Sequence, residues 1–131
     1  MATTPAFAAT PAVGSGIVPA TLDTSLTAPA NATTILTGIA AGTKIEEIVV
    51  EGLLTTVAGV LNVFLHDGTT YHLYDQFLIT AVVSSTTAKA YRASRQYPNL
   101  VLLNASWTLR VSQTVAGNQS GLKVTATGGS L

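Results

Sequence analysis

The stretch of sequence that decides the fold is Val60-Leu-Asn-Val-Phe-Leu-His-Asp-Gly-Thr-Thr-Tyr-His-Leu-Tyr-Asp-Gln-Phe-Leu-Ile79. Two runs rich in branched and aromatic side chains flank Asp67-Gly68, and such side chains favour β-strands. A dipeptide of this type readily adopts the positive φ angles that a tight hairpin turn requires. The stretch therefore predicts a β-hairpin.

The two faces of this hairpin differ in character. Successive side chains of a strand point to opposite faces. On that basis one face, which also holds Tyr71, belongs to the core and carries Leu61, Val63, Leu65, Leu73, Phe77 and Ile79. The other face carries Phe64, His66, His72, Tyr74 and Leu78. This second face is too apolar for open water, so we expect a second sheet or a neighbouring subunit to contact it.

From residue 33 onward the chain reads as a succession of short strands separated by turns. Outside the hairpin, the predicted strands cover residues 33–37, 43–54, 86–96, 100–103, 106–113 and 121–127. The composition of residues 86–96 would also suit a helix, but Thr86-Thr87 and the all-β rhythm favour a strand that Tyr97-Pro98-Asn99 ends. About eight strands at this spacing predict an all-β, jelly-roll-like antiparallel sandwich.

Residues 43–54 alternate imperfectly between apolar and polar side chains. Inward-facing side chains are expected at Ile45, Val49 and Leu53, and outward-facing ones at Lys44, Glu46 and Val50. The run Ile48-Val49-Val50 departs from that pattern, and a β-bulge or burial on both faces would explain it. Residues 106–113 alternate cleanly and direct Trp107, Leu109 and Val111 inward.

Residues 1–31 are predicted to form an extended N-terminal arm, and residues 32–131 the sandwich domain. The arm holds four of the five prolines and one charged residue, Asp23. Proline has no backbone N–H to donate to a neighbouring strand, and it disfavours the helical conformation in the preceding residue. No positive charge precedes Lys44, and no uninterrupted apolar run is present, so we expect no signal peptide. Such a segment could be a flexible terminus. Against this, it has apolar anchors that favour docking on the sandwich itself or on a neighbour, namely Phe7, Val13, Ile17, Val18, Leu22 and Leu26.

Charge is scarce throughout the 131 residues. Six basic and six acidic residues give a net charge of zero, and charged residues make up 9% of the chain, where about a quarter is usual. Scattered cations argue against nucleic acid as a partner, and no long apolar segment suggests a membrane span. A surface with so little self-repulsion tends to associate. We therefore expect a homo-oligomer within a larger assembly.

Candidate catalytic and metal-binding residues are few, and there is no cysteine to supply a thiolate. The cluster His66, Asp67, His72 and Asp75 is poorly spaced, since the odd separation places His72 and Asp75 on opposite faces, whereas His66 and His72 share the outer one. Glu47 and Glu51 share a strand face, with Glu46 on the other, and no second carboxylate opposes them as glycoside hydrolysis would require. We expect no enzymatic activity, no cofactor and no metal.

A carbohydrate platform would need exposed aromatic rings. Trp107 and Tyr71 fall on predicted core faces, which leaves Tyr74, Tyr91 and Tyr97 scattered along the chain. A glycan is therefore an alternative partner that these scattered tyrosines neither favour nor exclude.

Several segments resemble small virion structural proteins of tailed bacteriophages. They are the opening Met1-Ala-Thr-Thr-Pro-Ala-Phe-Ala-Ala-Thr-Pro, Thr43-Lys-Ile-Glu-Glu-Ile, Ala58-Gly-Val-Leu-Asn-Val-Phe-Leu-His-Asp-Gly-Thr-Thr-Tyr and the terminal Val-Thr-Ala-Thr-Gly-Gly. The resemblance implies a β-sandwich made in the bacterial cytoplasm and carried on the virion, most often as a capsid decoration protein bound to the major capsid protein or other virion proteins. A tail- or fibre-associated module that binds a host surface or a glycan is the alternative.

Overall fold

The computed structural model describes residues 10–19, 21–115 and 121–131, and it is an all-β sandwich, as predicted. Among these residues there are eight strands and no helix. The strands are β1 (Pro11–Ile17), β2 (Thr33–Thr37), β3 (Thr43–Gly52), β4 (Gly59–His66), β5 (Tyr71–Ile79), β6 (Arg92–Leu102), β7 (Thr108–Gln113) and β8 (Leu122–Ser130). In the described part of the chain, no helix is therefore long and apolar enough to cross a membrane.

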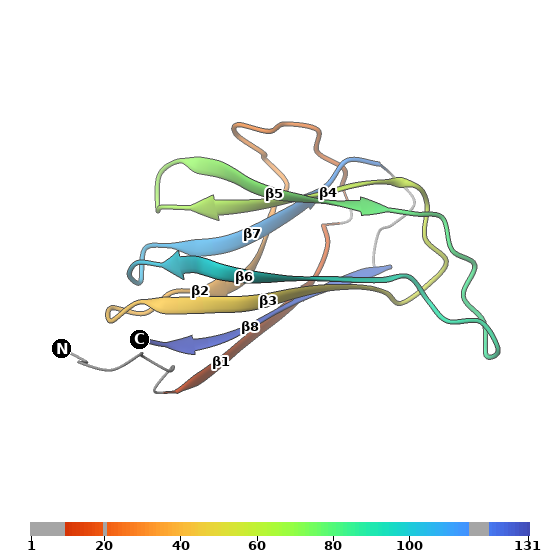
Figure 1. Ribbon diagram of the computed structural model, residues 1–131. Helices are drawn as coiled ribbons and strands as arrows, with labels where there is room; N and C mark the ends of the chain where they lie inside the picture. The colour runs from red at the N-terminus through yellow and green to blue at the C-terminus, as the bar shows by residue number, and fades with distance from the viewer. Residues whose placement is uncertain (1–9, 20, 116–120) are drawn as a thin grey trace.

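The strands form two four-stranded antiparallel sheets, which are stacked in Figure 1. Their orders are β1-β8-β3-β6 and β2-β7-β4-β5. The pairing is nested, because β1 pairs with β8, β2 with β7, β3 with β6 and β4 with β5. The chain thus resembles one long antiparallel ribbon folded over on itself, and its central hairpin is the predicted β4–β5 pair. Gly68 in the hairpin turn has a φ of 100°, as the Asp-Gly dipeptide predicts.

Part of the predicted arm belongs to the sandwich. Residues 11–17 form β1 and pair along their whole length with β8, from Pro11 opposite Gly129 to Ile17 opposite Lys123. Val18 follows the strand and is buried in the core. Of the two placements considered for this stretch, the structure shows docking on the chain's own sandwich. Phe7 lies outside the described residues.

The core lies between the two sheets, and each sheet contributes mainly branched aliphatic side chains to it. Fully buried members are Ile45, Ile48, Val50, Leu61, Val63, Leu100, Leu102, Leu109, Val111, Leu122, Val124 and Ala126. The inward assignments of Leu109 and Val111 are confirmed, and Trp107 packs against the core while remaining partly exposed. Burial of this apolar surface is the main source of stability, at about 25 cal/mol per Å².

A bulge in β3 reverses part of the predicted inward and outward assignment. The register shifts between Ile45 and Glu47 against both neighbouring strands. Against β8, Glu46 is the extra residue. Against β6, residues 97–99 lie opposite Glu46 alone. Beyond Glu46 the pleat is inverted, so Val50, predicted to face outward, is buried in the core. Leu53, predicted to face inward, lies just after the end of β3 and is exposed. Both explanations considered for residues 48–50 are therefore present: a bulge precedes them, and Ile48, Val49 and Val50 are all buried, which requires burial on both faces of β3.

The boundaries of the predicted strand 86–96 were wrong. Residues 84–91 lie outside any strand, and β6 runs from Arg92 through Pro98 to Leu102. Proline is tolerated there because β6 is an edge strand, and because residues 97–99 bulge opposite Glu46 and need no ladder partner on β3. The predicted break at Tyr97-Pro98-Asn99 is thus a bulge within one strand.

A second bulge lies in the hairpin itself. Val63 pairs with Asp75 and Phe64 with Leu73, which leaves Tyr74 as the extra residue of β5. Leu73 and Tyr71 therefore share the outer face with Phe64, and both predictions of a core position were wrong. The same shift places His72 and Asp75 on one face, where strict alternation had separated them.

Candidate functional site

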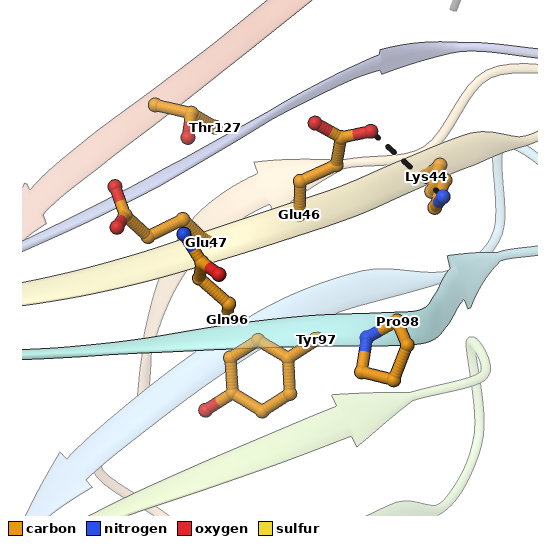
Figure 2. A pocket seen from close by; sticks show the side chains of 7 residues that line it. All are labelled: Lys44, Glu46, Glu47, Gln96, Tyr97, Pro98 and Thr127. Atoms are coloured by element: carbon orange, nitrogen blue, oxygen red, sulfur yellow. Dashed lines mark ion pairs between the residues drawn. The ribbon is translucent and has the colours of Figure 1, made fainter. Parts of the chain in front are cut away.

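A depression lies where the pairing of β3 with β6 is interrupted by a bulge. Its volume is about 510 Å³, and it is lined by Lys44, Glu46, Glu47, Gln96, Tyr97, Pro98 and Thr127; we call it the bulge hollow. Figure 2 shows these side chains along three strands, with Lys44, Glu46 and Glu47 on β3, Thr127 on β8, and Gln96, Tyr97 and Pro98 on β6. Glu46 and Glu47 are consecutive but both line the hollow, because a bulge places adjacent residues on the same side of a strand. The prediction that Glu46 faces away from Glu47 was wrong.

The polar part of the bulge hollow crosses three strands of the sheet. Glu47 pairs with Gln96 of β6 on one side and with Thr127 of β8 on the other. Such cross-strand neighbours have Cβ atoms about 5 Å apart. Lys44 forms an ion pair of 3.8 Å with Glu46, drawn as a dashed line in Figure 2. The hollow therefore combines two carboxylates, one amide, one hydroxyl and one ammonium.

Of the two apolar residues that line the hollow, Pro98 is exposed and Tyr97 belongs to the core. The Tyr97 ring is buried, and its hydroxyl donates a hydrogen bond of 2.6 Å to the Asp75 carboxylate of β5. Burial, together with that carboxylate, raises the pKa of Tyr97 well above its usual range, so the phenol stays protonated and donates. This bond joins the edges of the two sheets beside the hollow.

Asp75 is the acceptor at the centre of that junction. Besides Tyr97, it accepts hydrogen bonds from the Arg95 guanidinium and from the backbone N–H of Gln76. Partial burial raises the pKa of Asp75, but these three hydrogen bonds outweigh it and hold that pKa below its ordinary value of 3.8. The Arg95 guanidinium also lies 4.7 Å from the centroid of the Phe77 ring. The junction therefore depends on an ionised Asp75.

We expect Asp75→Asn to lower the free energy of unfolding at pH 7 by about 1 kcal/mol, because charge-assisted hydrogen bonds become neutral ones at a partly exposed site. The folded-state pKa of Asp75 lies below 3.8, so this carboxylate stabilises the fold above about pH 4 and loses that contribution as the pH falls through its folded pKa. Urea unfolding at pH 7, 5 and 3 measures the effect. The difference between wild type and variant should shrink at pH 3, and a constant difference would contradict the assignment.

The predicted histidine cluster is divided between two faces. His66 lies on the outer face, with its ring centroid 4.4 Å from that of Tyr71, and burial followed by the Arg110 charge lowers its pKa. His72 lies on the inner side, where its Nε2 is 3.0 Å from Asp67 and its ring stacks on Trp107 at 6.2 Å. The expectation of a shared outer face for the two histidines was wrong.

Asp67 organises the hairpin turn in addition to contacting His72. Its carboxylate accepts hydrogen bonds from the backbone N–H groups of Thr69 and Thr70, and the Thr70 bond is the largest cause of a lowered Asp67 pKa. Within the described residues, no group of three or more histidine and acidic side chains is placed to hold a metal ion. The contacts of this cluster are those of a turn.

The candidate contact residues fall into two groups. Val18 and Phe64 are buried within the chain itself, Phe64 beneath Tyr71 at a ring distance of 5.6 Å, so neither offers surface to a neighbour. Half-buried or exposed surface remains on Val13, Ile17, His66, His72, Tyr74 and Leu78. Of the scattered tyrosines, Tyr91 and Tyr97 are buried, whereas Tyr74 stays exposed beside Tyr97.

Sequence reasoning missed the Asp75–Arg95–Tyr97 junction and the joint position of Glu46 and Glu47. Both depend on bulges, and two sequence signals could have indicated them. Pro98 inside an apolar strand pattern is typical of a bulge on an edge strand. The blurred alternation at residues 48–50 indicates an inverted pleat nearby.

Comparisons with known proteins found no relatives: no protein-family model, no curated protein sequence and no solved structure matches this chain.

Proposed function

We propose that this chain is a non-enzymatic bacteriophage virion structural protein, most specifically a capsid decoration protein that binds the head surface as an oligomer and stabilises it. Several sequence segments of this chain resemble small virion structural proteins of tailed bacteriophages, and this resemblance is the first support. The structure adds a physical argument from the surface. Assembly would bury apolar and neutral polar area that a free monomer exposes, and many copies on one head would add avidity.

The observation that carries the proposal is the exposure of large apolar side chains on a chain with net charge zero. Val13 on edge strand β1 is 69% exposed, and Leu78 on edge strand β5 is 70% exposed. The loops add Val83 and Leu103 at 74% and 61%. Isolated exposed apolar residues are normal, but here few charges accompany them, and low net charge favours association.

The nested strand order supports the finer jelly-roll assignment. The first strand pairs with the last, the second with the second last, and so on to the central hairpin. This is the pairing expected when one long antiparallel ribbon is rolled into two packed sheets. Jelly rolls occur in viral capsid domains and also in lectins. Since one fold serves many functions, this likeness supports the virion proposal without deciding it.

We expect Val13→Lys and Leu78→Lys to reduce occupancy on phage heads purified without the protein, because each places a charge in an apolar contact. Neither side chain is buried, so both variants should keep the wild-type unfolding free energy within about 0.5 kcal/mol. Occupancy is measured by image reconstruction of the particle after incubation with the purified chain.

Glu51→Gln is the matched control, since it removes a charge from an exposed position instead of adding one. Analytical ultracentrifugation of the free protein tests the oligomer separately. A wild-type chain that stays monomeric at high concentration and leaves heads unoccupied would refute the proposal.

A host-surface or glycan-binding module is the second candidate. The bulge hollow favours it, because polar side chains from three strands surround a depression of about 510 Å³, which is within the size range of small-molecule sites.

A further inference from the structure

Part of the backbone beside the bulge hollow lies outside the β3–β6 ladder. Pairing between β3 and β6 passes from Ile45–Leu100 to Glu47–Gln96, so three residues of β6 lie opposite Glu46 alone. Pro98, the middle one of the three, has no N–H to donate. A bulge disrupts the ladder locally and leaves its extra residues unpaired there. The depression therefore lies at an interruption of the β3–β6 ladder, and side chains from three strands line it.

The side chains of the hollow favour one ligand chemistry. Glu47 offers hydrogen-bond acceptors, Gln96 and Thr127 offer both donors and acceptors, and Lys44 offers donors. Adjacent hydroxyl groups, each a donor and an acceptor, would match such a mixed set. Pro98, which is exposed, adds an apolar surface for the C–H groups of a sugar ring.

Other ligand classes fit less well. Two carboxylates against one ammonium give the hollow a net negative charge, which disfavours phosphates and acidic sugars. Ca²⁺ needs six to eight oxygen ligands, whereas here Glu46 already pairs with Lys44, whose ammonium would repel a cation. The volume of about 510 Å³ lies within the range of roughly 300–1,000 Å³ usual for small-molecule sites.

We propose that the bulge hollow binds a neutral saccharide, with Glu47, Gln96 and Thr127 as the hydroxyl-binding row. The inference deepens the second candidate function by naming its site and ligand class. It does not depend on binding to phage heads, so occupancy on heads and saccharide binding succeed or fail separately.

The test begins with a glycan array of neutral and acidic saccharides, probed with the full chain. The strongest neutral ligand is then titrated by isothermal calorimetry against wild type, Glu47→Gln and Gln96→Ala. Glu51→Gln is the matched control, because Glu51 lies on the same strand but outside the hollow, paired with Arg92 and Lys123. Thermal unfolding of each variant checks that the fold is retained.

We expect a neutral saccharide to bind wild type and Glu51→Gln equally, and Glu47→Gln and Gln96→Ala at least tenfold more weakly. Absence of neutral saccharide binding at millimolar concentration would overturn the proposal. Unchanged affinity in both hollow variants would overturn it as well, and so would a preference for acidic saccharides. Calcium binding that Glu47→Gln abolishes, without saccharide binding, would assign the hollow to a cation instead.

Discussion

Gly14→Ala is expected to destabilise the sandwich by about 3 kcal/mol, at the upper end of typical overpacking costs. A Cβ atom at Gly14 would lie 2.2 Å from the Ile35 carbonyl oxygen and 2.9 Å from Leu36 Cδ1. The carbonyl belongs to the backbone of β2, so it cannot rotate away as a side chain can. β1 and β2 lie in different sheets, so this contact is made between the two sheets. Urea unfolding measures the loss.

Gly16→Ala is the matched control on the same strand and the same face. Its Cβ would lie 3.1 and 3.3 Å from the side-chain methyl groups of Ile35 and Thr33, and 3.7 Å from the Thr34 carbonyl oxygen, which is an ordinary contact distance. The methyl groups can shift, and replacing glycine restricts the unfolded chain, which favours folding by about 0.5 kcal/mol. We expect Gly16→Ala to stay within about 1 kcal/mol of wild type. Equal stability of the two variants would show that β1 does not pack on β2 in this way.

Phe64→Ala is expected to cost about 3 kcal/mol, because a fully buried aromatic side chain would leave a cavity. The ring packs edge-on against Tyr71, whose hydroxyl accepts a hydrogen bond of 2.8 Å from Arg110. Arg110 and Leu73 also flank Phe64 as its cross-strand neighbours on β7 and β5. Phe64 is thus covered by its own sheet, although it lies on the outer face.

Leu78→Ala is the control for Phe64, since Leu78 shares the outer face of the hairpin but is mostly exposed. We expect its unfolding free energy to stay within about 0.5 kcal/mol of wild type. Urea unfolding of the two variants therefore shows which side chain stabilises the fold and which one is free to contact a partner. A Phe64→Ala variant as stable as Leu78→Ala would mean that the outer face is open at Phe64.

The candidate site shows why part of the structure could not be read from the chain. Strict alternation separates Glu46 from Glu47 and His72 from Asp75, and the structure brings both pairs onto common faces. Each reversal follows from one extra residue, at Glu46 or at Tyr74. Because the side-chain period of a strand is two, one inserted residue inverts every assignment beyond it. The imperfect alternation of apolar and polar side chains at residues 48–50 indicated an irregularity in this strand but did not show at which residue it lies.

The sequence by itself determined the all-β class, the central hairpin with its Gly68 turn, and the inward faces of strands without a bulge, such as Leu109 and Val111 on β7. These features depend on local backbone preference and on alternation within one strand. Only the tertiary structure decided the pairing of β1 with β8, the junction of Asp75 with Tyr97, and the bulge hollow. Those features depend on register between strands distant in the chain, which is set by the hydrogen bonds and packing of both partners together.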